Sequence, residues 1–178
     1  MRIDGNRIYL RTTTENDLKY FLEWETKESV TEFFTISDGR DLEEISTEYF
    51  ERLNDETKLQ FTICLKETDE PIGRIYISNI DSHYDSMDIT RIYIGRDDLR
   101  GTGLGEDSLR TCLKLGFEDM NLERITLDHF TDNVRAKNLY LKVGFTPEGC
   151  MRHGGKKNGK YIDLNLMSIL RDEYFSKK

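Results

Sequence analysis

Six residues near the middle of the chain carry the pattern with the clearest chemical meaning. Three glycines stand at alternate positions in Arg100-Gly101-Thr102-Gly103-Leu104-Gly105, between a β-rich run at 89–95 and a helix-like run at 106–120. The first N–H groups of a helix lack intrahelical partners, and the helix dipole adds partial positive charge there. Glycine lacks the Cβ atom that would hold a ligand away from these groups. The segment 100–105, here called the glycine loop, therefore predicts a cradle for phosphate.

The spacing of the glycines narrows the kind of phosphate site. A P-loop needs Lys followed by Ser or Thr after its last glycine, and neither follows here. A dinucleotide fingerprint needs G-x-G-x-x-G, but here the last glycine comes one residue early and Glu106 stands in its place. Glu123 lies at a suitable distance downstream, so the loop alone leaves a dinucleotide site open. It also leaves open a glycine-rich turn that only begins a helix.

Composition and length indicate one globular domain over residues 1–178. The chain is 37% hydrophobic and 34% charged, which is usual for such a domain. No apolar run approaches the ~20 residues of a membrane span, and the first residues lack a signal peptide's apolar core. Three cysteines and three histidines are scattered and form no C-x-x-C, so we expect neither disulfides nor a metal site. A reducing cytoplasm is the expected compartment.

The net charge of −8 limits the partners of the protein. A nucleic-acid-binding domain usually presents a broad basic face, and none is evident here. We therefore expect no nucleic acid and no membrane partner. An anionic cofactor remains compatible with this charge, because the field at a site is set by nearby groups.

Hydrophobic periodicity predicts the elements that would position the glycine loop. Thr14 and Asp17 form a capping-box pattern before the first helix, and Asn158–Gly159 predicts a hairpin turn. Strands are expected at 8–11, 61–65, 72–80, 89–95, 124–130, 145–153 and 161–169, and helices at 18–24, 42–53, 106–120 and 133–143. Helices interleaved with these strands predict an α/β (α+β) sandwich, with a mixed, mostly antiparallel central sheet of about seven strands flanked by helices.

A second segment, residues 133–145, follows the glycine loop by about one βα unit. Its sequence, N-x-x-A-x-x-L-Y-x-K-x-G-F, closely resembles motif B of the GNAT superfamily of N-acetyltransferases. The pattern Arg100-x-x-Gly103-x-Gly105 resembles motif A of the same superfamily. Both motifs occur in the expected order, and the tail from 159 to 174 is similar to the ribosomal-protein and spermidine acetyltransferase subgroup. The resemblance covers residues 87–147 strongly and the remainder loosely.

The resemblance implies acetyl-CoA as co-substrate and no metal. Backbone N–H groups of the glycine loop and Glu106 would hold the pyrophosphate, and the pantetheine arm would pair with the strand end at 92–94. Asn133 would bind the pantetheine amide region, and Lys142 is one of several basic residues that could reach the phosphates. The cofactor-binding residues implied in this way are Ile92, Tyr93, Ile94, Arg100, Gly101, Thr102, Gly103, Leu104, Gly105, Glu106, Asn133, Ala136, Tyr140 and Lys142.

The resemblance also implies catalytic roles. Tyr140 would be the general acid that protonates the departing thiolate, since a phenol of pKa about 10 suits a thiol near ~8.5. The N–H of Tyr93 or Ile94 would stabilise the charge on the carbonyl oxygen. Asp88 is the candidate base within its strand, where relatives often carry Glu; a water-relayed base is the alternative. By spacing alone, Tyr140 belongs to an apolar helix stripe, which favours a core residue; the resemblance favours the catalytic role instead.

The acceptor is expected to be a primary amine of a small molecule or polyamine, or a protein N-terminus. Acidic residues near Trp24 and two phenylalanines would suit a polycation, although they could also form a solvated helix face. These residues are Glu23, Glu25, Glu28, Glu32, Phe33 and Phe34. A non-catalytic acyl-CoA-binding sensor and a nucleotide-binding domain are the competing functions, and a homodimer is left open.

Overall fold

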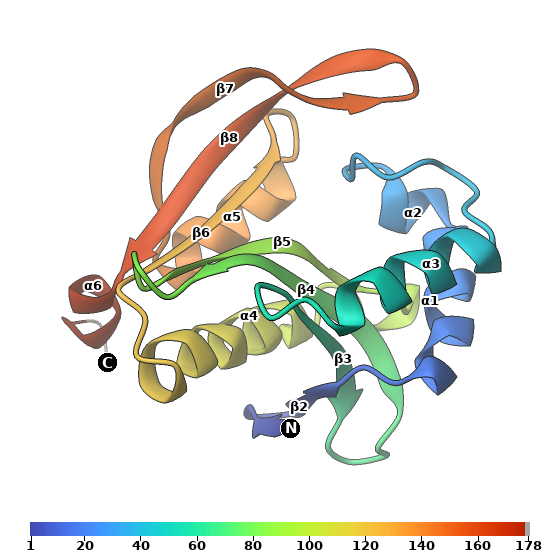
Figure 1. The fold of residues 1–178 in the computed structure, drawn as a ribbon, viewed down its shortest axis with the longest axis horizontal. Coiled ribbons are helices and arrows are strands. Elements are labelled where there is room, and N and C mark those ends of the chain that lie inside the picture. Colours follow the sequence, from blue (N-terminus) through green and yellow to red (C-terminus); the bar gives the residue numbers. More distant parts are fainter. Residues whose placement is uncertain (177–178) are drawn as a thin grey trace.

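An eight-stranded mixed sheet forms the centre of the computed structural model, which describes residues 1–176 (Figure 1). The strand order is β1-β2-β3-β4-β5-β6-β8-β7, and among these neighbours only β5 and β6 run parallel. The mixed, mostly antiparallel sandwich expected from the sequence is therefore confirmed, with one strand more than expected. Residues 177 and 178 of the expected domain lie outside the described residues.

The described elements follow the expected order closely. Short 3₁₀ turns at Glu15–Asp17 and Asp97–Leu99 and a π-helical turn at Leu115–Asp119 complete the path. In chain order the strands and helices are β1 (Arg2–Asp4), β2 (Ile8–Thr12), α1 (Leu18–Glu25), α2 (Glu28–Thr31), α3 (Leu42–Leu53), β3 (Leu59–Leu65), β4 (Pro71–Asp81), β5 (Ser86–Ile94), α4 (Leu104–Lys114), β6 (Arg124–Phe130), α5 (Val134–Val143), β7 (Thr146–Lys157), β8 (Lys160–Leu170) and α6 (Arg171–Ser176).

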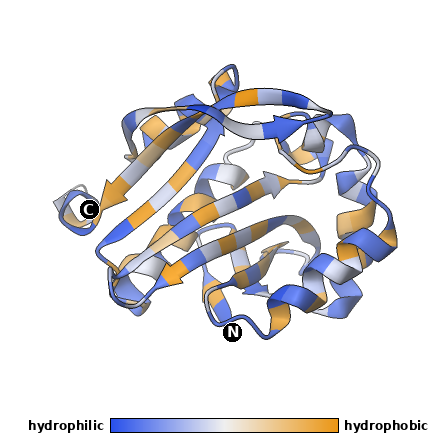
Figure 2. Ribbon diagram, turned by 45° about the horizontal axis from the view of Figure 1, so that its top comes forward, coloured by the Kyte–Doolittle hydropathy of each residue, from blue (hydrophilic) through white to orange (hydrophobic). Residues whose placement is uncertain are grey.

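Two apolar layers cover the two faces of the sheet. The larger layer joins α4 and α5 to the strands, and the smaller one joins α1, α2 and α3 to the far end of β5. Apolar and polar stretches alternate along the strands in Figure 2, as expected where one face of a strand is buried more than the other. Among residues 1–176, no helix has both the length and the apolar character needed to cross a bilayer.

Local sequence signals explain where the helices begin and end. The Thr14 N–H donates to Asp17 Oδ2 at 2.8 Å, and Asn133 Oδ1 accepts from the Ala136 N–H at 3.0 Å at the start of α5. Gly144 follows α5 with φ of +119°, a conformation that favours glycine. The expected caps are thus confirmed, as is the hairpin turn, where Asn158 and Gly159 both have positive φ.

The sequence did not indicate β1, α2 or α6. β1 has three residues, of which only Ile3 is buried, so it is too short to show an alternation. α2 has four residues and α6 has six, each less than two full turns of helix. These elements form because neighbouring structure holds them rather than because of their own periodicity.

The parallel strands β5 and β6 separate soon after they meet. They pair only over Ser86–Asp88 and Arg124–Thr126, and the rest of β5 pairs with β4 alone within the described residues. The two strands diverge in Figure 1 and leave one edge of β5 without a strand partner. We call this region the wedge; it is bounded by 89–94 of β5 and 127–130 of β6.

A β-bulge at Thr90 reverses which face of β5 each side chain occupies. Tyr76 of β4 lies opposite Arg91, whereas the next residue, Ile77, lies opposite Ile89, so no residue of β4 lies opposite Thr90 in the ladder. Before the bulge, Ile89 packs in the α4 layer; after it, Ile94 packs there, while Tyr93 joins the layer of α1 and α3. One strand thereby supplies side chains to both layers on either side of the wedge.

Candidate functional site

The glycine loop forms an open cradle in front of α4. Gly101 and Gly103 have φ of +76° and +88°, and a Cβ at either position would meet no atom within 4 Å. The Asp107 N–H donates to the Gly103 carbonyl at 3.0 Å, so the N–H groups of the three preceding helix residues lie before the regular hydrogen-bond ladder. The loop thus combines left-handed glycines, open space and a helix N-terminus, as a phosphate site requires.

Three contacts hold the glycine loop in its position. Arg100 Nε donates to the Ile94 carbonyl at 3.2 Å, which ties the loop to the end of β5. Thr102 Oγ1 donates to the Leu99 carbonyl at 2.6 Å, and Arg7 donates to the Thr102 carbonyl at 2.9 Å. The cradle is therefore held beside the open edge of β5.

Backbone alternation identifies which groups of β5 face the wedge. The Gly95 N–H donates to the Ile72 carbonyl of β4 at 2.8 Å. Since successive residues of a strand direct their N–H and C=O groups to opposite edges, Ile94 directs its own toward the wedge. Ile92 shares this direction, whereas the backbone of Tyr93 faces β4. The first and third of the three residues expected to contact the pantetheine arm thus present backbone groups to the wedge.

The residues expected on α5 lie across the wedge from β5. The cap of this helix uses Asn133 Oδ1, which leaves the amide nitrogen of the same side chain as a donor. Lys142, near the end of α5, forms an ion pair with Glu106 in the first turn of α4, and this pair lowers the pKa of Glu106. The structure thus brings Lys142 to the start of α4, while Ala136 is half-buried against the larger apolar layer.

Tyr140 lies in the apolar layer behind the wedge. Its side chain is 8% exposed, and its ring centroid is 5.9 Å from that of His129 and 6.0 Å from that of Phe145. Burial raises the pKa of Tyr140, and the negative charges of Asp128 and Asp88 raise it further. The phenol therefore stays protonated at neutral pH and lies within electrostatic reach of two carboxylates.

Asp88 lies at the point where β5 and β6 separate. Its carboxylate accepts from Thr126 Oγ1 at 2.8 Å and from Thr90 Oγ1 at 2.9 Å. Burial raises the pKa of Asp88, and the two threonine hydroxyls partly offset this effect. Within residues 1–176, no group of three or more His, Cys, Asp or Glu side chains is placed to hold a metal ion.

Asp128 is a carboxylate beside the wedge that sequence reasoning missed. It follows Thr126 by two residues on β6, and therefore lies on the same face as Thr126 and Asp88. Partial loss of hydration and, to a smaller extent, the negative charge of Asp88 raise the pKa of Asp128 to about 6. In the sequence, only the alternation within β6 indicated that Asp128 and Thr126 share a face. The register with β5 is needed to show that this face also carries Asp88.

The expected acidic wall needs one correction. Glu25 is fully buried rather than facing an acceptor, because α1 turns it into the layer beneath the sheet. There it accepts from Arg40 at 2.6 Å, from Arg74 at 2.9 Å and from the Tyr93 hydroxyl at 2.9 Å. Of the other acidic residues, Glu23, Glu28 and Glu32 are exposed. Glu25 therefore belongs to a buried ion cluster and not to a surface that attracts cations.

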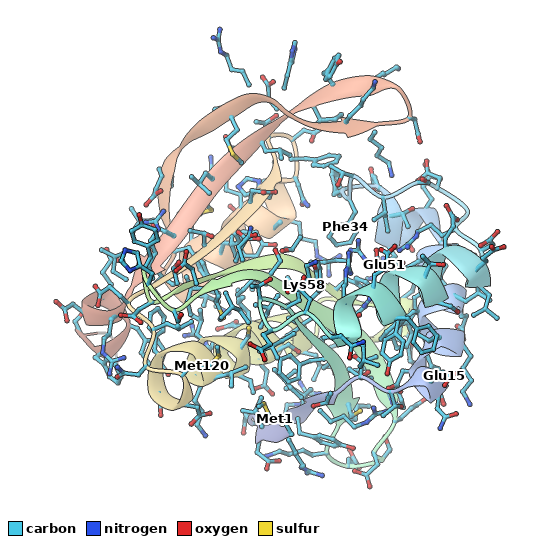
Figure 3. The ribbon with its side chains drawn as sticks, in the orientation of Figure 1. Met1, Glu15, Phe34, Glu51, Lys58 and Met120 are labelled. Carbon is cyan, nitrogen blue, oxygen red and sulfur yellow. The ribbon has the colours of Figure 1, made fainter. Side chains whose placement is uncertain are left out.

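Aromatic residues of the segment between α2 and α3 lie toward the wedge. Phe34 is labelled in Figure 3. Its ring centroid is 5.9 Å from that of Tyr93, and the Phe33 ring centroid is 6.2 Å from that of Phe130 at the end of β6. Phe33 and Phe34 are both half-buried. These rings place the 31–38 segment on the side of the sheet opposite the larger apolar layer.

Lys157 attaches the 31–38 segment to the β7–β8 hairpin. Its Nζ donates to the carbonyls of Thr31, Phe34 and Ile36 at 2.9, 3.1 and 3.3 Å, and to Asp38 at 2.8 Å. The side chain is 11% exposed, so these bonds are largely shielded from water. The hairpin thereby fixes the segment that carries Phe34.

Replacing Lys157 with methionine is expected to loosen the 31–38 segment. The carbonyls left without a donor should cost about 1–3 kcal/mol of unfolding free energy. Hydrogen exchange at residues 31–38 and thermal unfolding measure the effect. Lys156→Met, at the exposed neighbouring position, is the matched control and should change neither. Equal protection of the segment in both variants would contradict the anchoring role.

Comparisons with known proteins agree with this geometry. A family model described as "Acetyltransferase (GNAT) domain" matches residues 7–146. The uncharacterised N-acetyltransferase p20 of Bacillus licheniformis is 27% identical over 172 residues, 94% of this chain and 95% of that protein. Spermidine N(1)-acetyltransferase of Escherichia coli (strain K12) is 25% identical over 173 residues, 97% of this chain and 90% of that protein.

A solved structure shares the fold. Spermidine N-acetyltransferase from Vibrio cholerae, in complex with CoA and spermine, matches with a TM-score of 0.85 at 22% identity, over 95% of this chain and 98% of that chain. The mixed sheet and its flanking helices are therefore common to both proteins.

Proposed function

Because the chain belongs to the GNAT acetyltransferase family, it is an N-acetyltransferase, and we propose that it transfers the acetyl group of acetyl-CoA directly to the primary amine of a small molecule. The observation that carries this proposal is the position of the glycine loop. Arg100 ties the cradle to Ile94, at the open edge of β5, and the wedge leads from there toward Tyr140. The unpaired edge of β5 thus runs from the proposed phosphate site at the glycine loop toward Tyr140, the proposed proton donor.

The donor fits the wedge through backbone groups. N–H groups of residues 101–106 would bind the diphosphate, and the left-handed glycines keep side chains out of its way. The amide groups of the pantetheine arm would pair with Ile92 and Ile94, which face the wedge as an edge strand does. The Asn133 amide nitrogen would donate to the same arm. Lys142 would serve the phosphates only by leaving Glu106, with which it pairs here.

The residues of the wedge can supply the chemistry of acetyl transfer. Of the two N–H groups expected to stabilise the carbonyl oxygen, that of Tyr93 faces β4, and that of Ile94 lies beside the cradle, where it would serve the pantetheine arm instead. Tyr140 would give its proton to the departing sulfur. Its raised pKa keeps the phenol protonated at neutral pH, so the proton is available when the thiolate forms, although the same shift makes Tyr140 a weaker acid than a free phenol.

The acceptor that best suits the wedge is a polyamine. Asp88 and Asp128 supply negative charge on the face of the sheet from which an amine would approach, and Phe34 offers an aromatic ring beside it. Carboxylates and aromatic rings both attract alkylammonium groups. Two relatives named above carry spermidine acetylation in their names, and this chain would resemble them in its substrate.

Thiol release from acetyl-CoA in the presence of an amine panel tests this function. The panel contains spermidine, spermine, putrescine, an arylamine and peptides with a free N-terminus. We expect turnover with the polyamines and little with the arylamine. No turnover with any amine, together with CoA binding by calorimetry, would favour a sensor; binding of NAD but not CoA would favour a dinucleotide site.

Replacing Gly103 with alanine should separate cofactor binding from backbone strain. Gly103 has φ of +88°, and an added Cβ would stand in the open cradle, where it meets no protein atom of residues 1–176 within 4 Å. The left-handed conformation costs alanine about 1–2 kcal/mol, and the methyl group would displace a diphosphate that lies against the N–H groups. We expect the CoA dissociation constant to rise about tenfold or more, or ~1.4 kcal/mol.

Gly39→Ala, at φ of +68° and with equally open space, is the matched control. It should lose similar thermal stability and keep its CoA affinity. Calorimetry with CoA and thermal unfolding measure the two effects, and equal CoA affinity in the two variants would place the diphosphate elsewhere.

A further inference from the structure

We propose that Asp128 is the catalytic base that takes a proton from the acceptor amine, and that Asp88 is a positioning residue that sets the strength of this base. The inference rests on the proposed acetyl transfer and assigns the base of the same site. The sequence favoured Asp88 as the base; the structure favours Asp128, which lies beside the wedge on β6.

The sheet register places the two carboxylates around the opening of the wedge. Asp88 lies opposite Thr126 in the last pair of the parallel ladder, and Asp128 comes two residues later on β6, where β5 has already moved away. Thr126, Asp128 and Phe130 share one face of β6, and the Phe130 ring meets Phe33 of the 31–38 segment on that side. Asp128 thus lies between the point of divergence and the aromatic residues proposed to receive the amine.

Hydrogen bonding distinguishes the two carboxylates. Both oxygens of Asp88 accept from threonine hydroxyls, Oδ1 from Thr90 and Oδ2 from Thr126. Within residues 1–176, Asp128 accepts no hydrogen bond, and its side chain is exposed. Asp128 therefore has both lone pairs and space for an incoming N–H group, whereas those of Asp88 are committed within the protein.

The groups around Asp128 explain why it would be a usable base. From β5 it faces Asp88, and from α5 the phenol of Tyr140 lies within electrostatic reach. From β8 its cross-strand neighbour is Leu166, which carries no charge. Partial loss of hydration and the negative charge of Asp88 raise the pKa of Asp128 to about 6, and no nearby cation in the described part of the chain opposes them. The carboxylate is thus ionised at neutral pH yet more basic than an ordinary Asp.

The proposed step conserves atoms and electrons. The amine nitrogen uses its lone pair to bond to the acetyl carbon, and its proton passes to Asp128. The carbon–sulfur bond breaks, its electron pair stays on sulfur, and the sulfur takes the proton of Tyr140. Asp128 then loses its proton and Tyr140 regains one, through water, so the products are an amide and a free thiol. No oxidant, reductant or metal is needed.

A direct titration tests the electrostatic part without any turnover. Carbon-13 NMR of aspartate carboxyl groups in the unliganded protein should show one signal, assigned to Asp128 by its loss in Asp128→Asn, that titrates near pH 6. In Asp88→Asn this signal should titrate roughly one pH unit lower, because a like charge has been removed. A signal that titrates near pH 4, or that ignores the Asp88 substitution, would overturn the inference even in an active enzyme.

The pH dependence of kcat, measured with acetyl-CoA and spermidine, tests the catalytic part. The acidic limb of the wild-type profile should follow the Asp128 titration and shift downward in Asp88→Asn. Asp128→Asn should lose about 10²–10⁴-fold in kcat together with this limb. Asp132→Asn removes an exposed charge just beyond β6 and should alter neither. An Asp128→Asn enzyme with wild-type kcat would refute the base, whereas a wild type inactive on the whole amine panel would refute the proposed function.

Discussion

Replacing Tyr140 with phenylalanine is expected to lower kcat by about 10²–10⁴-fold while the affinity for CoA stays unchanged. The substitution removes one hydroxyl and keeps the ring that packs against His129 and Phe145. Without the phenol, the thiolate must leave without a proton or wait for water. Steady-state kinetics with acetyl-CoA and spermidine, together with calorimetry with CoA, measure the two quantities.

The split between kcat and binding separates a catalytic tyrosine from a core tyrosine. If Tyr140 only packs, the variant keeps the packing ring and should keep both its thermal stability and its turnover. Tyr84→Phe makes the same chemical change at a residue that is 71% exposed, and it should change neither kcat nor the affinity for CoA. Wild-type turnover in Tyr140→Phe would remove this residue from the mechanism.

Replacing Glu25 with glutamine is expected to destabilise the protein by about 3–5 kcal/mol. Arg40 and Arg74 both donate to this buried carboxylate, and Arg91 lies 3.5 Å from it. Glutamine keeps the shape but removes the charge, so buried guanidinium groups lose a counterion that water cannot replace. Glu48 remains nearby, and the arginines lower its pKa to about 2, but it must then balance the cluster alone.

A neighbouring residue of the same type provides the control. Glu23 lies on the same helix, is exposed and pairs with Lys27 at 3.2 Å. Glu23→Gln should change the unfolding free energy by no more than about 1 kcal/mol. Denaturant unfolding of both variants measures the difference. Equal stability of the two would mean that the buried cluster relaxes or admits water when its charge is removed.

The sequence was most informative where function depends on the backbone. The alternate glycines, the cap at Asn133 and the stop at Gly144 each follow from local stereochemistry, and the structure bears out all three. The succession of strands and helices along the chain followed from periodicity and turns. Even the bulge left a trace: apolar residues stand at Ile89 and then Ile92, a spacing of three where a regular strand has two.

The sequence was least informative where distant charges meet. Nothing near Glu25 indicates that arginines from three other parts of the chain surround it, since each partner comes from a different element. Asp128 was missed for a similar reason. Its environment depends on the register of β5 against β6, and residues that pair 38 positions apart have no local signature in the sequence.

The bulge gives β5 one position at which its length can change without cost to the two layers. Without Thr90, Ile89 and Arg91 would be neighbours in a regular strand. Arg91 and Tyr93 would keep their places on the side of α1 and α3, and Ile92 and Ile94 would keep theirs beneath α4. Loss of a residue between Arg91 and Ile94 would instead move the residues beyond it to the opposite face. Lineages of this protein should therefore lose Thr90 more readily than any residue from 91 to 94.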